Sequence, residues 1–408
     1  AALLTHRRRF ARMELADRLA MLERWSQGDL ARRTAVRALV VPLKVAHFDD
    51  PALYRQLGCV YEIRGQKEAR APYPRERVHD LATADGDLAL EVDAVVIGTG
   101  AGGAVVAREL AEAGVAVVMI EEGRYFERHE FTGRPFAMQQ QMYRAGGATM
   151  SLGNVAIPIP LGVTVGGTTT VNSGTCYRVP EHVLAHWRDD FGLREFTADH
   201  LDPYYQRVER VLGVAPTRPE ILGGCARVIA RGCDALGYRH APLKRNAPDC
   251  DGQGVCCFGC PTDAKRSTNV SYVPLALRAG AELFTHARAD RIIIEGGRAV
   301  GVTARAANGR TLTVRARAVV VACGSIMTPG FLERNGVGGG SGQLGRNLSI
   351  HPAAGALAEF DESIASWRGV PQSLAIEEFH DDGILFEGAA TPLEFTAALM
   401  PHLGPRLV

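Results

Sequence analysis

Three glycines with the spacing G-x-G-x-x-G are the first residues in this sequence that could do chemistry. They are Gly98, Gly100 and Gly103, and an acid, Glu121, follows them. Glycines at this spacing permit a tight turn, and they let backbone N–H groups approach a pyrophosphate at the N-terminus of the next helix. An acid about twenty residues further on can accept hydrogen bonds from ribose hydroxyls. The pattern predicts a dinucleotide site, and the alternative is an ordinary α/β crossover with a glycine-rich turn.

The elements that must position these residues are also visible in the sequence. An apolar run at 92–97 predicts a buried parallel strand, and a helical pattern follows to Ala113, where Gly114 can cap the helix. A second apolar run at 115–120 predicts another buried strand that ends at Glu121. Strand, glycine turn, helix, strand and acid form one βαβ unit. This unit alone does not distinguish NAD from FAD.

A cluster of cysteines is the second group with possible chemistry. Cys250, Cys256, Cys257 and Cys260 have the spacing C-x5-C-C-x2-C. Four thiols this close together could bind zinc or an iron–sulfur cluster. Adjacent cysteines fit poorly with two C-x2-C pairs, so the pattern favours a compact loop lined by thiols over an iron–sulfur cluster or a structural metal. No metal ligand is assigned from this pattern.

Composition limits the class of protein. The 408 residues are enough for two or three domains, and a net charge of +1 gives no field that would attract nucleic acid. No run of 18 apolar residues predicts a membrane span. Nine cysteines, two of them adjacent, indicate reduced intracellular thiols, so we expect a cytoplasmic protein. The apolar segment 36–48, interrupted by Pro42, is expected to pack internally; a peripheral contact with a membrane surface is the alternative.

The remaining patterns divide the chain. Residues 3–70 have helical spacing, 71–90 resemble a polar linker, and 123–180 are expected to be irregular, with Gly166-Gly167-Thr168 in a loop. Helical spacing returns over 181–240.

A change to strand patterns follows. We predict strands at 291–295, 299–305 and 311–315, joined by hairpin turns at Gly296-Gly297 and Asn308-Gly309, where both central positions need positive φ. A further buried strand is predicted at 318–322, before Cys323-Gly324-Ser325. An antiparallel meander at this place favours FAD over NAD.

Five motifs in order give the chain a family resemblance. They are VIGTGAGGAVVARELAEAGVAVVMIEEG, GVTVGGTTTVNSGTCYR, AKRSTNVSYVPLAL, AVVVACGSIMTPGFLERNGV and GRNLSIHP. With these motifs the chain resembles the glucose–methanol–choline oxidoreductases, and most of all their long-chain alcohol oxidase branch. The resemblance implies an α/β fold: a Rossmann-like FAD-binding domain with a parallel sheet and an inserted antiparallel meander, an incomplete substrate domain, and a helical N-terminal extension.

The resemblance also implies domain limits and cofactor contacts. The extension and linker would occupy 1–88, the FAD-binding domain 89–180 and 265–350, and the substrate domain 181–264 and 351–408. The implied cofactor-binding residues are Gly98, Gly100, Gly103, Glu121, Gly166, Gly167, Thr168, Asn172, Ala289, Ala322 and Gly324. Gly98, Gly100 and Gly103 would hold the FAD pyrophosphate, and Glu121 would bind the adenosine ribose. Gly166, Gly167 and Thr168 would run beside the pyrophosphate and the flavin edge. Asn172 would lie near the isoalloxazine ring. Ala289 would meet the adenine, and Ala322 and Gly324 would line the nucleotide from the other side.

The implied reaction is FAD-dependent oxidation of a primary, long-chain alcohol to the aldehyde, with hydride transfer to flavin N5 and with O₂ or an unknown electron acceptor. The family's catalytic histidine motif does not occur in this chain, so no catalytic residue is assigned, and the base is expected beyond Val408. His351 in NLSIHP is interpreted as structural. Two alternatives stay open: an FAD and iron–sulfur sugar or polyol dehydrogenase, and a catalytically incomplete FAD-binding fragment.

Overall fold

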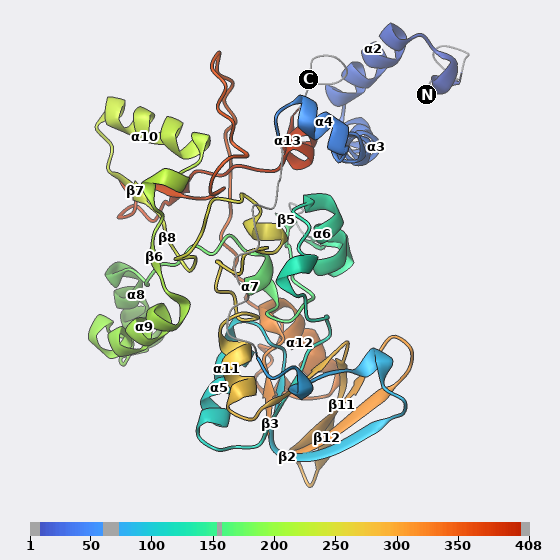
Figure 1. Cartoon of the computed structure of the whole chain (residues 1–408), viewed down its shortest axis with the longest axis vertical. Coiled ribbons are helices and arrows are strands. Elements are labelled where there is room, and N and C mark those ends of the chain that lie inside the picture. Colours follow the sequence, from blue (N-terminus) through green and yellow to red (C-terminus); the bar gives the residue numbers. More distant parts are fainter. Residues whose placement is uncertain (1–8, 60–72, 153–156, 401–408) are drawn as a thin grey trace. The chain divides into compact units, whose positions relative to one another are not determined.

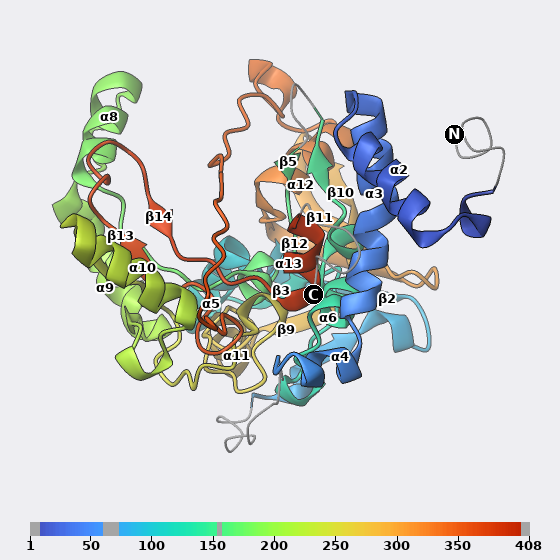
Figure 2. The same cartoon turned by 90° about the horizontal axis from the view of Figure 1, so that it is seen from above.

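The computed structural model describes residues 9–59, 73–152 and 157–400. The chain forms two compact units, one made of Ala1–Val60 with Thr391–Val408 and the other of Tyr61–Ala390. Figure 1 shows the chain coloured along its sequence, and Figure 2 shows it turned by 90°.

The first unit is helical in its described part. Its α-helices are α2 (Leu15–Ser26), α3 (Leu30–Phe48), α4 (Pro51–Gln56) and α13 (Leu393–Leu399). Helices α3 and α13 pack against each other, although they lie at opposite ends of the sequence. Pro42 lies inside α3 and does not break it, so the predicted interruption is wrong. A proline removes one helical hydrogen bond, and the buried residues Val36, Val45 and Phe48 hold the helix on both sides of it. No helix in the described part of the chain is long and apolar enough to cross a membrane.

A large mixed sheet organises the second unit. Among the described residues its strand order is β1-β9-β3-β2-β12-β11-β10. These strands are β1 (Val78–Asp80), β2 (Leu88–Ile97), β3 (Val117–Ile120), β9 (Glu282–Thr285), β10 (Arg288–Glu295), β11 (Arg298–Arg305) and β12 (Thr311–Val321). Neighbours from β1 to β12 pair in parallel, and β12, β11 and β10 pair antiparallel. The structure therefore confirms the predicted α/β fold with a parallel sheet and an antiparallel meander.

Both faces of β3 and of the last four residues of β2 are buried, which explains their continuous apolar sequence. Ala94 and Val96 of β2 pack in one core with α5 (Ala101–Glu112) and α11 (Tyr272–Arg278). Val95 and Ile97, which point to the opposite face, pack in a second core with residues of the meander. Figure 1 shows α5 and α11 beside each other near β3.

Three predictions about the sheet need correction. The strands predicted at 311–315 and 318–322 are one strand, β12, which pairs with β11 through its first half and with β2 along most of its length. The predicted linker 71–90 contains β1, which forms an edge of the sheet beside β9. Gly296 and Gly297 both have positive φ, as predicted, but at the next turn only Gly309 does. The loop 306–310 is longer than a two-residue hairpin turn and needs only one such position.

The rest of the second unit consists of shorter elements. Its other helices are α6 (Pro135–Met142), α7 (Thr168–Val171), α8 (Glu181–Phe191), α9 (Ala198–Leu212), α10 (Gly224–Leu236) and α12 (Gly324–Arg334). Its other strands are β4 (Met150–Ser151), β5 (Ile157–Pro158), β6 (Ala215–Pro216), β7 (His240–Pro242), β8 (Lys244–Arg245), β13 (Leu374–Ile376) and β14 (Phe386–Glu387). Helix α6 lies in the region predicted to be irregular. The assignment of 181–264 and 351–408 to a substrate domain stays a prediction.

Candidate cofactor-binding site

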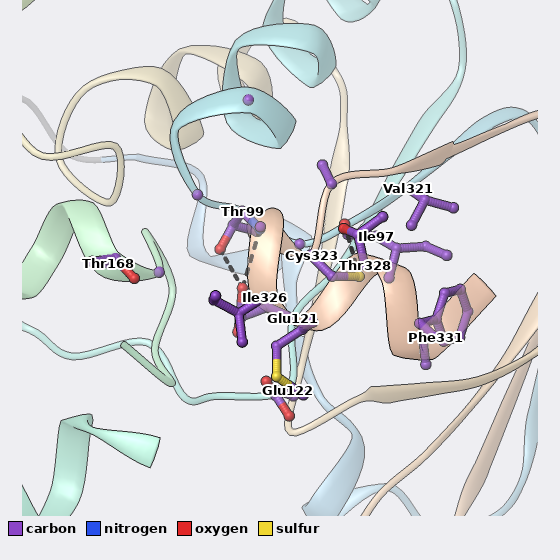
Figure 3. A pocket seen from close by; sticks show the side chains of 18 of the residues that line it. Ile97, Thr99, Glu121, Glu122, Thr168, Val321, Cys323, Ile326, Thr328 and Phe331 are labelled. Atoms are coloured by element: carbon purple, nitrogen blue, oxygen red, sulfur yellow. Dashed lines mark hydrogen bonds between the residues drawn. The ribbon is translucent and has the colours of Figure 1, made fainter. Parts of the chain in front are cut away.

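A cavity of about 840 Å³ lies at the carboxyl ends of three neighbouring parallel strands. Its wall includes Ile97 at the end of β2, Ile120 at the end of β3 and Val321 at the end of β12. The crevice outside the carboxyl ends of parallel strands is where open α/β sheets bind their ligands. Figure 3 shows the side chains that line this cavity, including Glu121 and Thr168 on different segments.

The glycine turn after β2 brings backbone to the edge of this cavity. Gly98 has a φ of +99°, and a Cβ there would lie 2.5 Å from the carbonyl oxygen of Ala322. Gly100 is the N-cap residue of α5, which has no side-chain cap and no acid in its first turn. A Cβ on Gly100 would meet nothing within 4 Å, because this position faces the cavity. An uncapped helix N-terminus beside open space suits the pyrophosphate of a dinucleotide, so the residues present fit FAD.

Gly103 lies outside the cavity wall. A Cβ at this position would lie 1.9 Å from the carbonyl oxygen of Gly98, so the helix can approach the turn only if residue 103 has no side chain. This glycine permits close packing of the helix against the turn and the strand. Gly103 does not line the cavity, so its predicted contact with the pyrophosphate has no support from the structure.

Glu121 is a buried acid whose side chain is held by the glycine turn. Its carboxylate accepts hydrogen bonds from the N–H of Thr99 at 3.1 Å, the hydroxyl of Thr99 at 2.7 Å and the N–H of Gly123 at 3.0 Å. Burial raises the pKa of Glu121, and these donors partly oppose the shift. The carboxylate is thus fixed in the cavity wall, and its contact with the ribose stays a prediction.

Thr99 is a site residue that the sequence analysis missed. Its hydroxyl donates to Glu121 and accepts the N–H of Gly166 at 2.9 Å, and its carbonyl oxygen accepts the hydroxyl of Thr268 at 2.9 Å. It therefore joins the glycine turn to two segments that are distant in sequence. The only signal for it was a hydroxyl residue between the first two glycines of the motif.

The segment that contains Gly166 and Gly167 supplies some, but not all, of the cavity-lining residues that we expected from it. Gly167 and Thr168 line the cavity, whereas Gly166 and Asn172 do not. Gly166 points its N–H toward Thr99, away from open space. Asn172 follows the end of α7, and its carbonyl oxygen is bound by a buried lysine. A contact between Asn172 and the flavin stays a prediction.

The opposite wall comes from the meander and α12. Ala289, Ala322 and Gly324 all line the cavity, and their contact with the nucleotide stays a prediction. Cys323, between the last two, was missed as a lining residue, and burial raises the pKa of its thiol to about 11. Figure 3 shows it beside Ile97, whose carbonyl oxygen accepts a 3.8 Å hydrogen bond from the thiol.

A charged group in the cavity was also missed. Arg144 forms an ion pair with Glu122, and Arg288 lies 4.0 Å from the same carboxylate. Burial and the neighbouring charge of Arg288 lower the pKa of Arg144. The three side chains line the cavity next to Glu121. They carry no sequence motif, and only the fold brings 122, 144 and 288 together.

The cysteine segment lies outside this cavity. Three of its thiols accept hydrogen bonds: Cys250 and Cys260 from backbone N–H groups at 3.4 Å, and Cys256 from the guanidinium of Arg245 at 3.1 Å. They line a void of only about 10 Å³. Throughout the described residues, which include these cysteines, no group of three or more His, Cys, Asp or Glu side chains is arranged to hold a metal ion.

The family follows from the sequence matches. Residues 139–353 match the family model described as GMC oxidoreductase. The chain belongs to the GMC oxidoreductase family. Members of this family are flavoproteins, and their cofactor is FAD.

Relatives place the chain within this family. An uncharacterized GMC-type oxidoreductase of Mycobacterium tuberculosis is 41% identical over 410 residues, which cover 100% of this chain and 64% of the relative. A long-chain-alcohol oxidase of Arabidopsis thaliana is 30% identical over 303 residues, 71% of this chain and 40% of that protein. Formate oxidase of Aspergillus oryzae overlaps with a TM-score of 0.46 at 18% identity, over 65% of this chain and 51% of that one; the family assignment does not depend on it. This chain thus spans about two thirds or less of the length of these relatives.

Proposed function

We propose that this chain takes part in the FAD-dependent oxidation of a primary, long-chain alcohol to the aldehyde, with dioxygen as the electron acceptor. The cavity around Glu121, lined by glycine backbone in a GMC family member, is the observation that carries this proposal. The similarity to plant proteins named long-chain-alcohol oxidases supports the choice of alcohol and acceptor.

The residues of the chain would bind and orient the cofactor. FAD, when bound, supplies the flavin that accepts a hydride. The N–H groups at the start of α5 would hold the pyrophosphate, Glu121 would accept hydrogen bonds from the ribose, and Gly167 and Thr168 would run beside the pyrophosphate and the flavin edge. Ala289, Ala322 and Gly324 would enclose the nucleotide from the side of the meander and α12.

No residue is assigned as the base that takes the hydroxyl proton. His351, interpreted as structural, is exposed and does not line the cavity. The alternative of a sugar or polyol dehydrogenase with an iron–sulfur cluster has no observation in its favour, because the cysteine segment offers no metal arrangement within the described residues.

A spectroscopic experiment tests the proposal in two steps. The purified chain should bind FAD and show flavin absorption near about 375 and 450 nm. Under anaerobic conditions 1-dodecanol should bleach the 450 nm band, slowly because no side chain of this chain is assigned as the base, whereas glucose and choline should not. A chain that binds no FAD would refute the cofactor site. A flavin that is bound but not reduced by 1-dodecanol would refute the proposed activity for this chain and leave the cofactor site intact.

Gly100→Val is the matched variant. A Cβ at this position would meet no protein atom within 4 Å, and the position lines the cavity, so the valine side chain is expected to take up space meant for the cofactor. We therefore expect a folded chain that loses FAD, which circular dichroism and the absorption spectrum measure together.

A further inference from the structure

A buried lysine outside the cavity holds the segment that forms one of its walls. Lys265 is only 2% exposed. Its ammonium donates hydrogen bonds to the carbonyl oxygens of Thr169 at 3.1 Å, Thr170 at 2.8 Å and Asn172 at 2.6 Å. An ammonium has three N–H donors, so every one of them is used on this one segment.

The segment needs such a partner because of its local structure. Helix α7 has four residues. The last carbonyl groups of a helix find no N–H donor within the helix, so they need donors from elsewhere. They carry the negative end of the helix dipole, which a cation stabilises. The guanidinium of Arg245 donates to the carbonyl oxygen of Ser173. The hydroxyl of Tyr143 lies 3.1 Å from the carbonyl oxygen of Val171, but it has one proton and lies closer to the carbonyl oxygen of Cys257, at 2.6 Å. Side chains from other segments thus contact every carbonyl group from 169 to 173, and Lys265 binds three of them.

The opposite end of the same segment reaches the cofactor cavity. Gly167, Thr168 and Thr169 line it, and the N–H of Gly166 is bound to Thr99, which in turn holds Glu121. The segment is therefore fixed at its start by the glycine turn and at its end by Lys265. Lys265 itself does not line the cavity.

No carboxylate is among the groups with the largest electrostatic effect on Lys265 in the described part of the chain. These groups are the thiols of Cys257, Cys256 and Cys260 and the cation Arg245. Burial lowers the pKa of Lys265. A buried ammonium without a carboxylate is unfavourable for stability unless its hydrogen bonds compensate. Its compensation here is the carbonyl groups of the cavity segment.

We propose that Lys265 is a positioning residue for the cofactor: by binding the carbonyl groups of Thr169, Thr170 and Asn172, it keeps Gly167 and Thr168 in the place that FAD contacts. This inference rests on the proposed placement of those two residues beside FAD. It does not depend on which alcohol is oxidised, since it concerns retention of the cofactor.

The test compares two buried lysines. In Lys265→Met the carbonyl groups lose their donors. Lys44→Met is the matched control, because Lys44 is also buried and donates to a backbone carbonyl, that of Met400 at 2.7 Å, in the other compact unit. The FAD-loaded chain is diluted, and the rise in fluorescence of released FAD gives the dissociation rate, at a temperature where circular dichroism shows every variant folded.

We expect Lys265→Met to release FAD at least 10-fold faster than the unchanged chain and Lys44→Met to release it at the same rate. Lys265→Arg, which keeps the charge but not the tetrahedral donor geometry, should give an intermediate rate. If Lys265→Met does not fold, Lys265→Arg decides, because it alters the donors to the same three carbonyl groups and should speed release several-fold. An unchanged rate in folded Lys265→Met, an equal increase in Lys44→Met, or an unchanged rate in Lys265→Arg when Lys265→Met is unfolded would overturn the proposal. Failure of 1-dodecanol to reduce the flavin would not, since release is measured without substrate.

Discussion

The cofactor cavity and the cysteine segment 250–260 belong to the same unit, and both stood out in the sequence through unusual residues. The cavity is built from backbone: glycines that let a turn, a helix end and a strand approach each other, with one buried carboxylate among them. The cysteine segment is built from side chains, whose thiols accept N–H groups around a void of about 10 Å³. A glycine pattern constrains the backbone directly, whereas a cysteine spacing leaves the arrangement of the sulfur atoms to the fold.

The largest effect in this comparison is expected from Gly103→Val. The new Cβ would lie 1.9 Å from the carbonyl oxygen of Gly98, and neither backbone can move away without separating α5 from β2. We expect a loss of about 3 kcal/mol or more in the free energy of unfolding, measured by chemical denaturation without FAD. Gly102→Ala is the control: a Cβ there meets nothing within 4 Å, so stability should be unchanged or rise by up to about 1 kcal/mol. Equal effects of the two variants would contradict this account of the turn.

A smaller effect is expected from Glu121→Gln. The amide cannot accept all three hydrogen bonds that the carboxylate receives from Thr99 and Gly123, and it offers a weaker acceptor to a ribose hydroxyl. Loss of a charge-assisted hydrogen bond of about 1.5–3 kcal/mol predicts that FAD binds roughly 10-fold to 100-fold more weakly. Titration with FAD followed by flavin fluorescence measures the change. Unchanged affinity would remove Glu121 from the binding site.

The same acid predicts a pH dependence of the chain without FAD. Burial raises the pKa of Glu121 above 4.5 in the folded state, so the folded chain holds this proton more tightly than the unfolded chain. The resulting stabilisation is fully present below about pH 4.5 and is lost as the pH rises through the raised pKa. In denaturation experiments between pH 4 and 8, the free energy of unfolding should therefore fall less steeply with pH in Glu121→Gln than in the unchanged chain. Parallel curves would contradict the raised pKa.

The last prediction concerns the thiols of the cysteine segment and involves no substitution. Burial raises the pKa of Cys250 and of Cys257 to about 11. At pH 8 these thiols should react with a disulfide reagent about 100-fold more slowly in the folded chain than in the unfolded chain, because only the thiolate attacks. Mass spectrometry of the labelled chain identifies the cysteines that have reacted. Rapid labelling of either thiol in the folded chain would show that the segment is a reactive site and not a packed one.

Part of the site could be predicted because it is local. Gly98, Gly100, Glu121, Ala322 and Gly324 follow directly from strand ends, and the carboxyl ends of parallel strands meet at one edge. Thr99 could not be predicted, because its partners Gly166 and Thr268 come from distant segments. The same holds for the ion pair of Glu122 with Arg144, and for Lys265, whose acceptors lie 93 to 96 residues earlier in the chain.

The sequence by itself determined the βαβ unit and the meander, because apolar runs and glycine turns specify local structure within a few residues. It also determined the family and the cofactor, because the family's motifs occur in a fixed order. The tertiary structure alone decided that β12 serves the meander and the parallel sheet as one strand, and that α3 continues through Pro42. It also decided that the cysteines pack around a small void and that a buried ammonium fixes a cavity wall. These features depend on which distant groups come into contact, and no local pattern of residues specifies that.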